Sequence, residues 1–358
     1  MAVKNLKRGA VTTGSAEATA AGELELIERI RDRVRQTGRT AGGLKLGIGD
    51  DCALLAVRAG EQIAVTTDLS IAGRHFRLDW HAPEAIGHRT LARGLSDLAA
   101  MGARPVAAFL SLGLPVELTR ADGGLQARKP KKTEKAWIDR FYDGLLALAE
   151  ATGTPLAGGD LAQSPVAVAD IVLVGAVRSG QALLRSGARA GDLLYVTGRL
   201  GGAAAGLALL AAGKGKPHRS SAPEAETPLG PHLYPQPRLE QGQLLARRKL
   251  ATAAMDLSDG LSIDLARLCA ESGVTAEIDA RLIPLFPGAT LEQALHGGED
   301  YELLFAARPE AKLPHAIAGV LLTRIGRVLP TRKGRTAVTL VSEDGKRPLA
   351  SEGWEHFA

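Results

Sequence analysis

Aspartates beside glycines, serines and threonines recur at five places along the chain, and these residues have the clearest chemical use. The places are Gly47-Ile48-Gly49-Asp50-Asp51, Thr66-Thr67-Asp68, Ser96-Asp97, Gly158-Gly159-Asp160 and Asp256-Leu257-Ser258-Asp259-Gly260. Hard divalent cations prefer oxygen ligands, and Mg²⁺ in proteins typically combines a few carboxylates with phosphate oxygens and water. This set of oxygen donors therefore indicates a site for several such ions.

A purely structural interpretation of the same residues stays open. Asp and Ser beside Gly are ordinary formers of turns and helix N-caps, and each place taken singly is better explained in that way. Three of the places are interpreted as turns, and Thr66-Thr67-Asp68 is expected at the end of an apolar strand. Asp97 interrupts an otherwise apolar helix face. Five places that follow apolar segments favour the metal interpretation more than any one of them does.

Three further residues have weaker chemical interpretations. His75 follows Asp68 closely, Arg185 could pair with a phosphate, and Trp354 could stack on a flat ring. Taken singly, each is better explained without a ligand, His75 and Arg185 by a surface role and Trp354 by an anchoring role.

Several classes of nucleotide-binding protein are excluded by missing signatures. The chain has no Gly-x4-Gly-Lys-Ser/Thr segment, so it is not a Walker-type nucleotidase. Gly47-x-Gly49 is followed by two aspartates, which would repel a pyrophosphate, so a dinucleotide-binding interpretation is poor. The protein-kinase pair of His-Arg-Asp and Asp-Phe-Gly is also missing.

Hydrophobic periodicity places these residues on a mixture of strands and helices. In the first half we expect strands at 62–71, 106–114 and 166–177, helices at 83–101 and 134–151, and an exposed loop at 119–133. In the second half we expect strands at 193–197, 275–285, 301–307 and 321–328 and helices at 201–212, 238–250 and 262–272, with a loop at 213–232. The alternation is not strict, which favours two mixed α/β (α+β) domains over one doubly wound sheet. The predicted division is a disordered extension at 1–21, one domain at 22–178 and a second at 179–358.

Composition narrows the choice of partner and compartment. Among 358 residues, 44 Lys and Arg against 39 Asp and Glu give a net charge of +5, which permits anionic ligands. Aromatic residues make up only 4%, which argues against a platform for stacking nucleic-acid bases. The two cysteines, Cys52 and Cys269, exclude a disulfide scaffold and are expected as reduced, mostly buried thiols. No apolar segment has the length of a membrane span or the form of a secretory signal, so we expect a cytoplasmic protein.

The order and spacing of seven motifs are similar to those of the thiamine-monophosphate kinase family. The motifs are Leu46-Gly-Ile-Gly-Asp-Asp-Cys-Ala-Leu-Leu55, Thr67-Asp68 with His75-Phe76, Leu95-Ser-Asp-Leu-Ala-Ala-Met-Gly102, Gly158-Gly-Asp160, Arg185-Ser-Gly187, Asp256-Leu-Ser-Asp-Gly260 and Gly297-Gly-Glu-Asp-Tyr-Glu302. Each motif is weak alone, but their common order is specific. The resemblance extends from about Glu23 to the C-terminus.

The resemblance implies a fold, a reaction and a set of ligands. The fold is the one shared with aminoimidazole ribonucleotide synthetase and selenophosphate synthetase, in which two chains pair through their N-terminal domains. ATP would phosphorylate thiamine monophosphate to thiamine diphosphate, the final step of its biosynthesis, with several Mg²⁺ ions. The implied metal ligands are Asp51, Thr66, Thr67, Asp68, Asp97, Asp160, Asp256 and Asp259. The implied nucleotide contacts are Tyr142, Gly159, Asp160, Arg185 and Ser258, and the implied contacts to thiamine monophosphate are His75, Glu299 and Trp354.

The chemistry of this reaction agrees with a site rich in Asp and poor in nucleophiles. The acceptor is a phosphate monoester whose second pKa is about 6, so it is largely ionised at pH 7 and requires no protein general base. The obstacle is repulsion between two anions, which metal ions and in-line positioning address. On this interpretation Glu299 offers thiamine a negative charge or a hydrogen-bond acceptor.

Three positions depart from the family pattern, and two other functions stay open. Gly94 replaces the usual Asn before Leu-Ser-Asp, Leu161 replaces the common Thr, and His296 replaces a small residue. None of these removes a predicted carboxylate. The nearest alternative is another phosphotransferase or ATP-dependent ligase of the same fold. A second is a non-catalytic nucleotide- or RNA-binding protein that uses its basic loops; we expect no nucleic-acid partner, because all the Asp motifs are retained.

Overall fold

The computed structural model describes residues 23–36, 43–49, 51–120, 135–214, 227–331 and 337–353. The extension predicted at 1–21, most of the loop predicted at 119–133, and Trp354 lie outside these residues. Within the described part of the chain, no helix is both long and apolar enough to cross a membrane.

The first half of the chain forms a four-stranded sheet covered by helices on one face. Its strands are β3 (Glu61–Ile71), β4 (Arg104–Leu114), β5 (Leu156–Gln163) and β6 (Val168–Arg178), in the spatial order β3-β6-β4-β5. The pair β4–β5 is parallel and the other two pairs are antiparallel. The accompanying elements are α1 (Glu23–Gln36), α2 (Pro83–Ala100), η1 (Val116–Thr119), α3 (Trp137–Thr152) and the small hairpin of β1 (Leu44–Leu46) and β2 (Leu54–Leu55).

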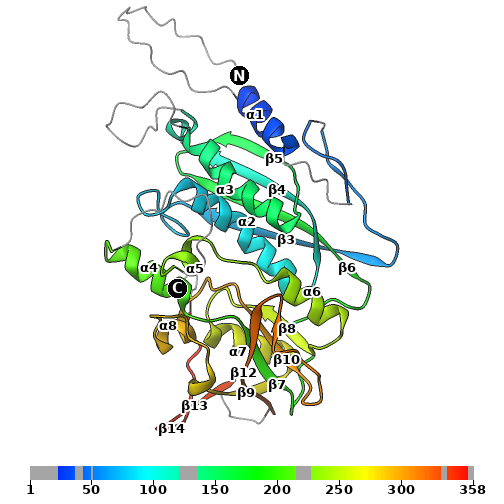
Figure 1. The fold of residues 1–358 in the computed structure, drawn as a ribbon, viewed down its shortest axis with the longest axis vertical. Helices are drawn as coiled ribbons and strands as arrows, with labels where there is room; N and C mark the ends of the chain where they lie inside the picture. The colour runs from blue at the N-terminus through cyan, green and yellow to red at the C-terminus, as the bar shows by residue number, and fades with distance from the viewer. Residues whose placement is uncertain are drawn as a thin grey trace, which may run out of the picture.

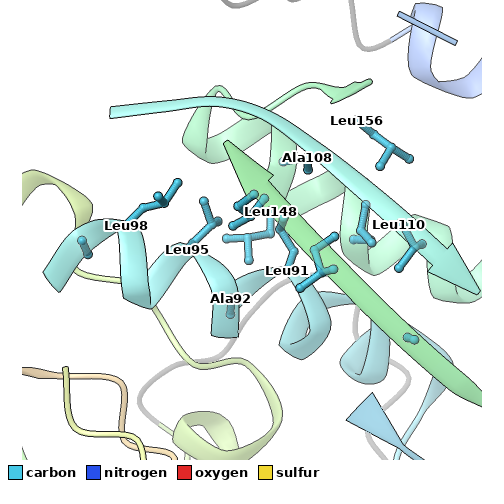
Figure 2. Packing of buried hydrophobic residues seen from close by; sticks show 14 of the residues in the cluster. Leu91, Ala92, Leu95, Leu98, Ala108, Leu110, Leu148 and Leu156 are labelled. Carbon is cyan, nitrogen blue, oxygen red and sulfur yellow. The ribbon is translucent and has the colours of Figure 1, made fainter. Parts of the chain in front are cut away.

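Helix α2 is the central element of this half. It begins with Pro83, which suits the first turn because the missing N–H has no intrahelical partner there. Leu91, Leu95 and Leu98 are fully buried and point from α2 toward Ala108 and Leu110 on β4 (Figure 2). Burial of this apolar stripe against the sheet fixes the rotation of the helix.

Two glycines allow α2 and α3 to cross at very short range. A Cβ atom on Gly87 would lie 1.9 Å from the Phe141 carbonyl oxygen, and one on Gly144 would lie 1.8 Å from the Glu84 carbonyl oxygen. No side chain fits at either position, so the two backbones are in direct contact.

The second half forms a larger sheet. Its strands are β7 (Leu193–Thr197), β8 (Ala253–Asp256), β9 (Val274–Asp279), β10 (Leu303–Ala307), β11 (Ala316–Ile317), β12 (Val320–Pro330), β13 (Val338–Ser342) and β14 (Gly345–Pro348). The order is β14-β13-β9-β12-β7-β10-β8, with β11 beside β12, and only the β13–β9 pair is parallel. The helices are α4 (Gly202–Ala211), α5 (Gly230–Leu233), α6 (Leu239–Arg247), α7 (Leu261–Ser272) and α8 (Leu291–His296), with η2 at Ala280–Leu282.

The two halves share a hydrophobic core along α2. Helix α6 lies between the two sheets and packs on α2 (Figure 1). A Cβ atom on Gly242 of α6 would lie 1.8 Å from the Ala99 carbonyl oxygen, so these helices also meet backbone to backbone. Leu245 of α6 and Phe305 of β10 belong to the same buried cluster as Leu95. Consequently α2 carries side chains that face both halves of the molecule.

The predicted mixed α/β fold in two parts is confirmed, and three local predictions are wrong. Asp68 lies inside β3 and not at its end, because β3 continues to Ile71. Gly158-Gly159-Asp160 is not a turn but part of strand β5, which the sequence did not reveal. A Cβ atom on Gly159 would lie 1.9 Å from the Leu110 carbonyl oxygen, so only glycine allows β5 to lie this close to β4 at that position. Cys52 is exposed, whereas Cys269 is buried as expected.

Candidate active site

Seven of the predicted site residues line one cavity between the two halves. The cavity has a volume of about 370 Å³, and these residues are Asp68, His75, Asp97, Asp256, Ser258, Asp259 and Glu299. They come from β3, from the segment after it, from α2, from the end of β8 and from the segment before β10. Residues separated by more than 200 positions therefore meet at one place.

Asp97, which is half-buried, and Asp256, which is buried, form an acidic pair where the two halves meet. The Thr66 hydroxyl donates to Asp97, and the Ser96 hydroxyl donates to Asp256 at 2.7 Å. Burial raises the pKa of both carboxyl groups, and their mutual repulsion raises the pKa of Asp256 further, to about 7. A cation bound between them would remove that repulsion.

Two arginines of α2 hold the acidic residues on the other side of the cavity. The Arg93 guanidinium lies 2.6 Å from Asp68 and 3.9 Å from Glu299, and Arg89 donates to both Glu299 oxygens at 2.8 Å. Burial opposes ionisation of Glu299, but the charge of Arg89 outweighs it and lowers the pKa to about 2. Glu299 is therefore ionised at neutral pH.

The loop after β8 is held by a residue that the sequence motifs did not include. Asp264, in the first turn of α7, accepts hydrogen bonds from the backbone N–H groups of Ser258, Asp259 and Gly260 at 3.0–3.1 Å. These bonds fix the loop so that Ser258 and Asp259 face the cavity. Arg267 forms an ion pair with Asp259.

Four of the remaining predicted residues gather at a second cavity of about 730 Å³ in the first half. Asp51, Tyr142, Gly159 and Asp160 line it together with Phe109 and Ser111 of β4. Burial raises the pKa of the Tyr142 hydroxyl above its usual range, so this group is a neutral hydrogen-bonding partner.

Thr67 and Arg185 line neither cavity. The Thr67 side chain lies on the face of β3 opposite to Thr66 and Asp68, because successive residues of a strand alternate in direction. The Arg185 side chain is exposed, yet its positive charge acts on both Asp97 and Asp256.

Comparisons with known proteins identify the family. Residues 49–177 match the model of the AIR synthase related protein N-terminal domain, and residues 189–339 match that of the C-terminal domain. A thiamine-monophosphate kinase of Escherichia coli K12 is 38% identical over 352 residues, which cover 95% of this chain and 99% of that protein. The chain belongs to the thiamine-monophosphate kinase family.

Solved structures of this family share the fold. The crystal structure of thiamine-monophosphate kinase from Stenotrophomonas maltophilia K279a has a TM-score of 0.73 and 36% identity, covering 86% of this chain and 94% of that one. AaThiL complexed with AMPPCP and TMP has a TM-score of 0.68 and 30% identity, covering 94% of this chain and 97% of that one. The protein is accordingly a kinase with the architecture of this family.

Two of the three departures from the thiamine-monophosphate kinase motifs, Gly94 and His296, line neither cavity, and the third, Leu161, lines the second one. A Cβ atom on Gly94 would lie 2.9 Å from Leu173, so this glycine allows α2 to approach β6. His296 contacts the Ser262 hydroxyl and the Glu352 carbonyl and so fastens the C-terminal segment.

Trp354, the third predicted contact to thiamine monophosphate, directly follows Gly353, the last described residue. A Cβ atom on Gly353 would lie 2.6 Å from the Asp259 carbonyl oxygen, so the described chain ends beside the loop that follows β8.

The motif Gly297-Gly-Glu-Asp-Tyr-Glu302 divides its three acidic residues among three tasks. Glu299 faces the cavity, with a backbone φ of 68°. Asp300 accepts from the backbone N–H groups of Gly201 and Ala203 at the start of α4, and Glu302 is buried against Thr197 and Arg238. Only Glu299 is therefore available to a ligand, and the other two carboxylates hold the segment that presents it.

Sequence reasoning missed Arg89, Arg93 and Asp264. A signal for the arginines was present, because two cations four residues apart interrupt a helix whose other residues are mostly apolar or small. Asp264 had no distinguishing signal, because an acidic residue in a first helical turn is common.

The oxygen donors suit an ion such as Mg²⁺, which takes few protein ligands, better than a metal ion coordinated entirely by protein side chains. Among the residues that the structure describes, no three His, Cys, Asp or Glu side chains are close enough to hold an ion. Mg²⁺ usually takes one or two carboxylates and completes its shell with water and substrate phosphates. The acidic pair of Asp97 and Asp256 is a donor set of that kind.

Proposed function

We propose that this chain transfers the γ-phosphoryl group of ATP to thiamine monophosphate and releases thiamine diphosphate and ADP. The observation that carries the proposal is the cavity in which Asp68, Asp97 and Asp256 converge, in a chain 38% identical to a thiamine-monophosphate kinase over almost its full length. The related AaThiL complex with AMPPCP and TMP supports both substrates.

The cavity supplies charge and position, and no base. The acceptor phosphate is already an anion at pH 7, so its oxygen can attack without losing a proton to the protein. Asp51, Thr66, Thr67, Asp68, Asp97, Asp160, Asp256 and Asp259 are the proposed ligands of several Mg²⁺ ions. Bound magnesium neutralises phosphate oxygens and so lowers the repulsion between donor and acceptor. Asp97 and Asp256 fit this role because each raises the electrostatic cost of ionising the other.

Glu299 is proposed to accept a hydrogen bond from the thiamine part of the acceptor. Arg89 donates hydrogen bonds to both Glu299 oxygens and offsets their negative charge. Glu299 is therefore less suited to balance the positive charge of a thiazolium ring than to accept a hydrogen bond. Each carboxylate oxygen still has a free lone pair. His75 lines the same cavity. Trp354 remains a proposed contact from outside the described residues.

The nucleotide is proposed to contact Tyr142, Gly159, Asp160, Arg185 and Ser258. These residues lie in two places, because Ser258 lines the cavity between the halves and Tyr142, Gly159 and Asp160 line the second cavity. A single nucleotide can contact both groups of residues only if the two cavities are brought together. We propose that a second chain, packed on the first sheet, brings the second cavity of one chain to the cavity between the halves of the other.

We infer a homodimer from the uncovered face of the first sheet. Ile63, Val65 and Leu69 of β3 are 58%, 61% and 45% exposed, and Val172 and Val174 of β6 lie beside them in register. An apolar sheet face of this kind marks an interaction surface. Phe109 and Ser111 connect it to the second cavity.

Two further assignments are proposed on this basis. The domain division at residues 178 and 179 is supported by connectivity, since β6 ends the first sheet at Arg178 and the second sheet starts at Leu193. A cytoplasmic location is supported by the exposed thiol of Cys52, which suits a reducing compartment.

The decisive experiment measures product from ATP and thiamine monophosphate with Mg²⁺ by chromatography, with free thiamine as a parallel acceptor. We expect thiamine diphosphate from the monophosphate, no product from thiamine, and no product when EDTA removes the metal. Folded protein that binds ATP and forms no thiamine diphosphate would leave the fold intact and refute the acceptor.

The role of Asp97 is tested in the same assay. Asp97→Asn keeps the hydrogen bond from Thr66 but loses the charge, so we expect turnover to fall by at least about 100-fold with an unchanged circular dichroism spectrum. Near-normal turnover of this variant at limiting Mg²⁺ would contradict its role as a metal ligand.

A further inference from the structure

A third arginine pairs with a carboxylate of the main cavity, and it does so from outside the cavity. Arg267 of α7 forms an ion pair with Asp259, which lines the cavity between the halves, whereas Arg267 is not among the residues that line it. Arg267 also belongs to none of the seven motifs on which the family resemblance rests. The proposed function therefore gives this contact no role.

Arg267 has a second partner that is fixed in place. One guanidinium nitrogen, Nη1, donates to Asp264 Oδ1 at 2.9 Å and also to Asp259 Oδ2. The Asp264 side chain is fully buried, and its other oxygen accepts the three backbone N–H groups of residues 258–260. Asp264 cannot move without breaking these bonds, so it still holds Arg267 when the contact with Asp259 is broken.

The backbone of the loop after β8 does not depend on Arg267. Besides the bonds to Asp264, the carbonyls of Leu257 and Ser258 accept backbone N–H groups from the segment before β10, at 2.9 and 2.7 Å. Loss of the ion pair therefore frees the Asp259 side chain and leaves the loop where it is.

Solvent exposure distinguishes Arg267 from the two arginines of α2. The side chains of Arg89 and Arg93, which pair with Glu299 and Asp68, are 4% and 13% exposed, whereas that of Arg267 is 40% exposed. A buried guanidinium that leaves its carboxylate exposes an unpaired charge to the protein interior, which is costly. An exposed guanidinium exchanges its partner for water at little cost. Of these three arginines, Arg267 is the one that a competing cation can displace.

We propose that Arg267 is an exchangeable counter-ion of Asp259, which pairs with this carboxylate in the metal-free protein and yields it to a bound Mg²⁺ ion while keeping its contact with Asp264. Two cations compete for one carboxylate, so Arg267 weakens metal binding and stabilises the acidic loop before the metal binds. The inference rests on the proposed function in that Asp259 is a proposed magnesium ligand, and it names the group that the ion must displace.

The first test titrates the full-length, nucleotide-free protein with Mn²⁺, with free Mn²⁺ measured by electron paramagnetic resonance. Arg267→Met keeps a long side chain but removes the competing charge, so we expect the Kd for Mn²⁺ to fall about 3- to 5-fold, the upper value for a partly exposed ion pair. Arg267→Lys keeps the charge, and its Kd should lie within about 1.5-fold of the wild-type value. An unchanged or higher Kd in Arg267→Met would overturn the proposal, and so would a wild type that binds no Mn²⁺.

Two controls connect the effect to Asp259. In an Asp259→Asn background, Arg267→Met should change the Kd by less than about 1.5-fold, because the carboxylate for which the cations compete is gone. Arg281→Met breaks an exposed ion pair with Asp279, neither of which lines the two cavities, and should leave the Kd unchanged. Equal effects of Arg267→Met with and without the Asp259 carboxylate would show a general effect of charge and would overturn the exchange.

Thermal unfolding tests the exchange without the reaction. In EDTA, Arg267→Met should lower Tm by about 1–3 °C, because Asp259 and Asp264 both lose a cation. In saturating Mg²⁺ the loss should be smaller, because the wild type has then also given up the contact with Asp259. An equal loss in both conditions would contradict the proposal. A chain that shows the expected Mn²⁺ affinities and forms no thiamine diphosphate would refute the proposed function and leave the exchange intact.

Discussion

At the scale of single residues, the site is built from carboxylates that would repel one another in the absence of a ligand. Asp256 is buried and Asp97 is half-buried, and a hydroxyl group donates a hydrogen bond to each, from Ser96 and Thr66 respectively. Arginine partners are placed at Asp68 and Glu299 instead. The acidic pair therefore has no arginine ion partner among the described residues, whereas Asp68 and Glu299 each have one, as the proposed magnesium site requires.

A stability measurement tests this interpretation of Asp256. Its pKa is about 7 in the folded protein and about 3.9 in an unfolded chain, so the folded state binds the extra proton between these values. The free energy of unfolding of the wild type therefore falls as the pH rises from about 4 to 7, because ionising the buried Asp256 carboxyl group is costly in the folded state. Asp256→Asn lacks this loss and should raise Tm by roughly 2–6 °C at pH 8 and by little at pH 4.

The measurement is calorimetry in EDTA, with the exposed Asp344→Asn as the matched control. The control should not change Tm at either pH. An Asp256→Asn protein that is less stable than wild type at pH 8 would show that the carboxylate is satisfied within the fold. The same variant should lose turnover, so stability and activity are expected to move in opposite directions.

At the scale of elements, helix α2 connects the two halves of the site. Its apolar stripe packs on the first sheet, Ser96 reaches Asp256 of the second sheet, and Arg89 and Arg93 reach the cavity. Because the position of α2 sets all of these distances, the helix contacts that fix it affect the site at a distance. The crossing with α3 at Gly87 and Gly144 is as close as the contact with α6 at Gly242.

Substitution at this crossing should destabilise the protein. Alanine has the better helix propensity by about 1 kcal/mol, yet a Cβ at position 144 would overlap the Glu84 carbonyl at 1.8 Å. We expect Gly144→Ala to lower the free energy of unfolding by about 1–3 kcal/mol. Glu150→Ala, at an exposed position of the same helix, should change it by less than about 0.5 kcal/mol in the same denaturant titration. A stabilised Gly144→Ala protein would contradict the close crossing.

At the scale of the whole molecule, the first sheet is covered by helices on one face and presents apolar residues on the other. Antiparallel sheets of single proteins normally expose a polar face. The exposed apolar residues of β3 alternate with Thr66 and Asp68, so one strand serves the cavity with one side and the proposed dimer with the other. The proposed dimer would therefore link assembly and catalysis through β3.

A charge on this face should separate the dimer. Val65 is 61% exposed and lies near the centre of β3, so Val65→Asp would place an unpaired carboxylate in the interface. We expect light scattering to give a dimer for the wild type and a monomer for Val65→Asp. Leu321→Asp, at an equally apolar exposed position of the second sheet, should remain a dimer. A monomeric wild type under assay conditions would refute the dimer itself.

The sequence alone determined the chemistry and the class of fold. Motifs such as Asp256-Leu-Ser-Asp-Gly260 are local, because the loop and the oxygen donors on it come from one short segment whose backbone requires glycine and short polar residues. Hydrophobic periodicity predicted α2, β3 and β4 within a few residues, because each of these elements buries one face and its apolar residues recur with the period of that face. These properties require no knowledge of which segments meet.

The tertiary structure decided which residues face one another. Sequence could not show that Arg89 pairs with Glu299 or that His81 meets His232. Strand β5 was not predicted, because Gly159 is required by the close approach of the Leu110 carbonyl on the neighbouring strand and not by a hydrophobic pattern within β5. Contacts between distant segments depend on the packing of α2 between two sheets, and that packing follows from the free energy of the whole core.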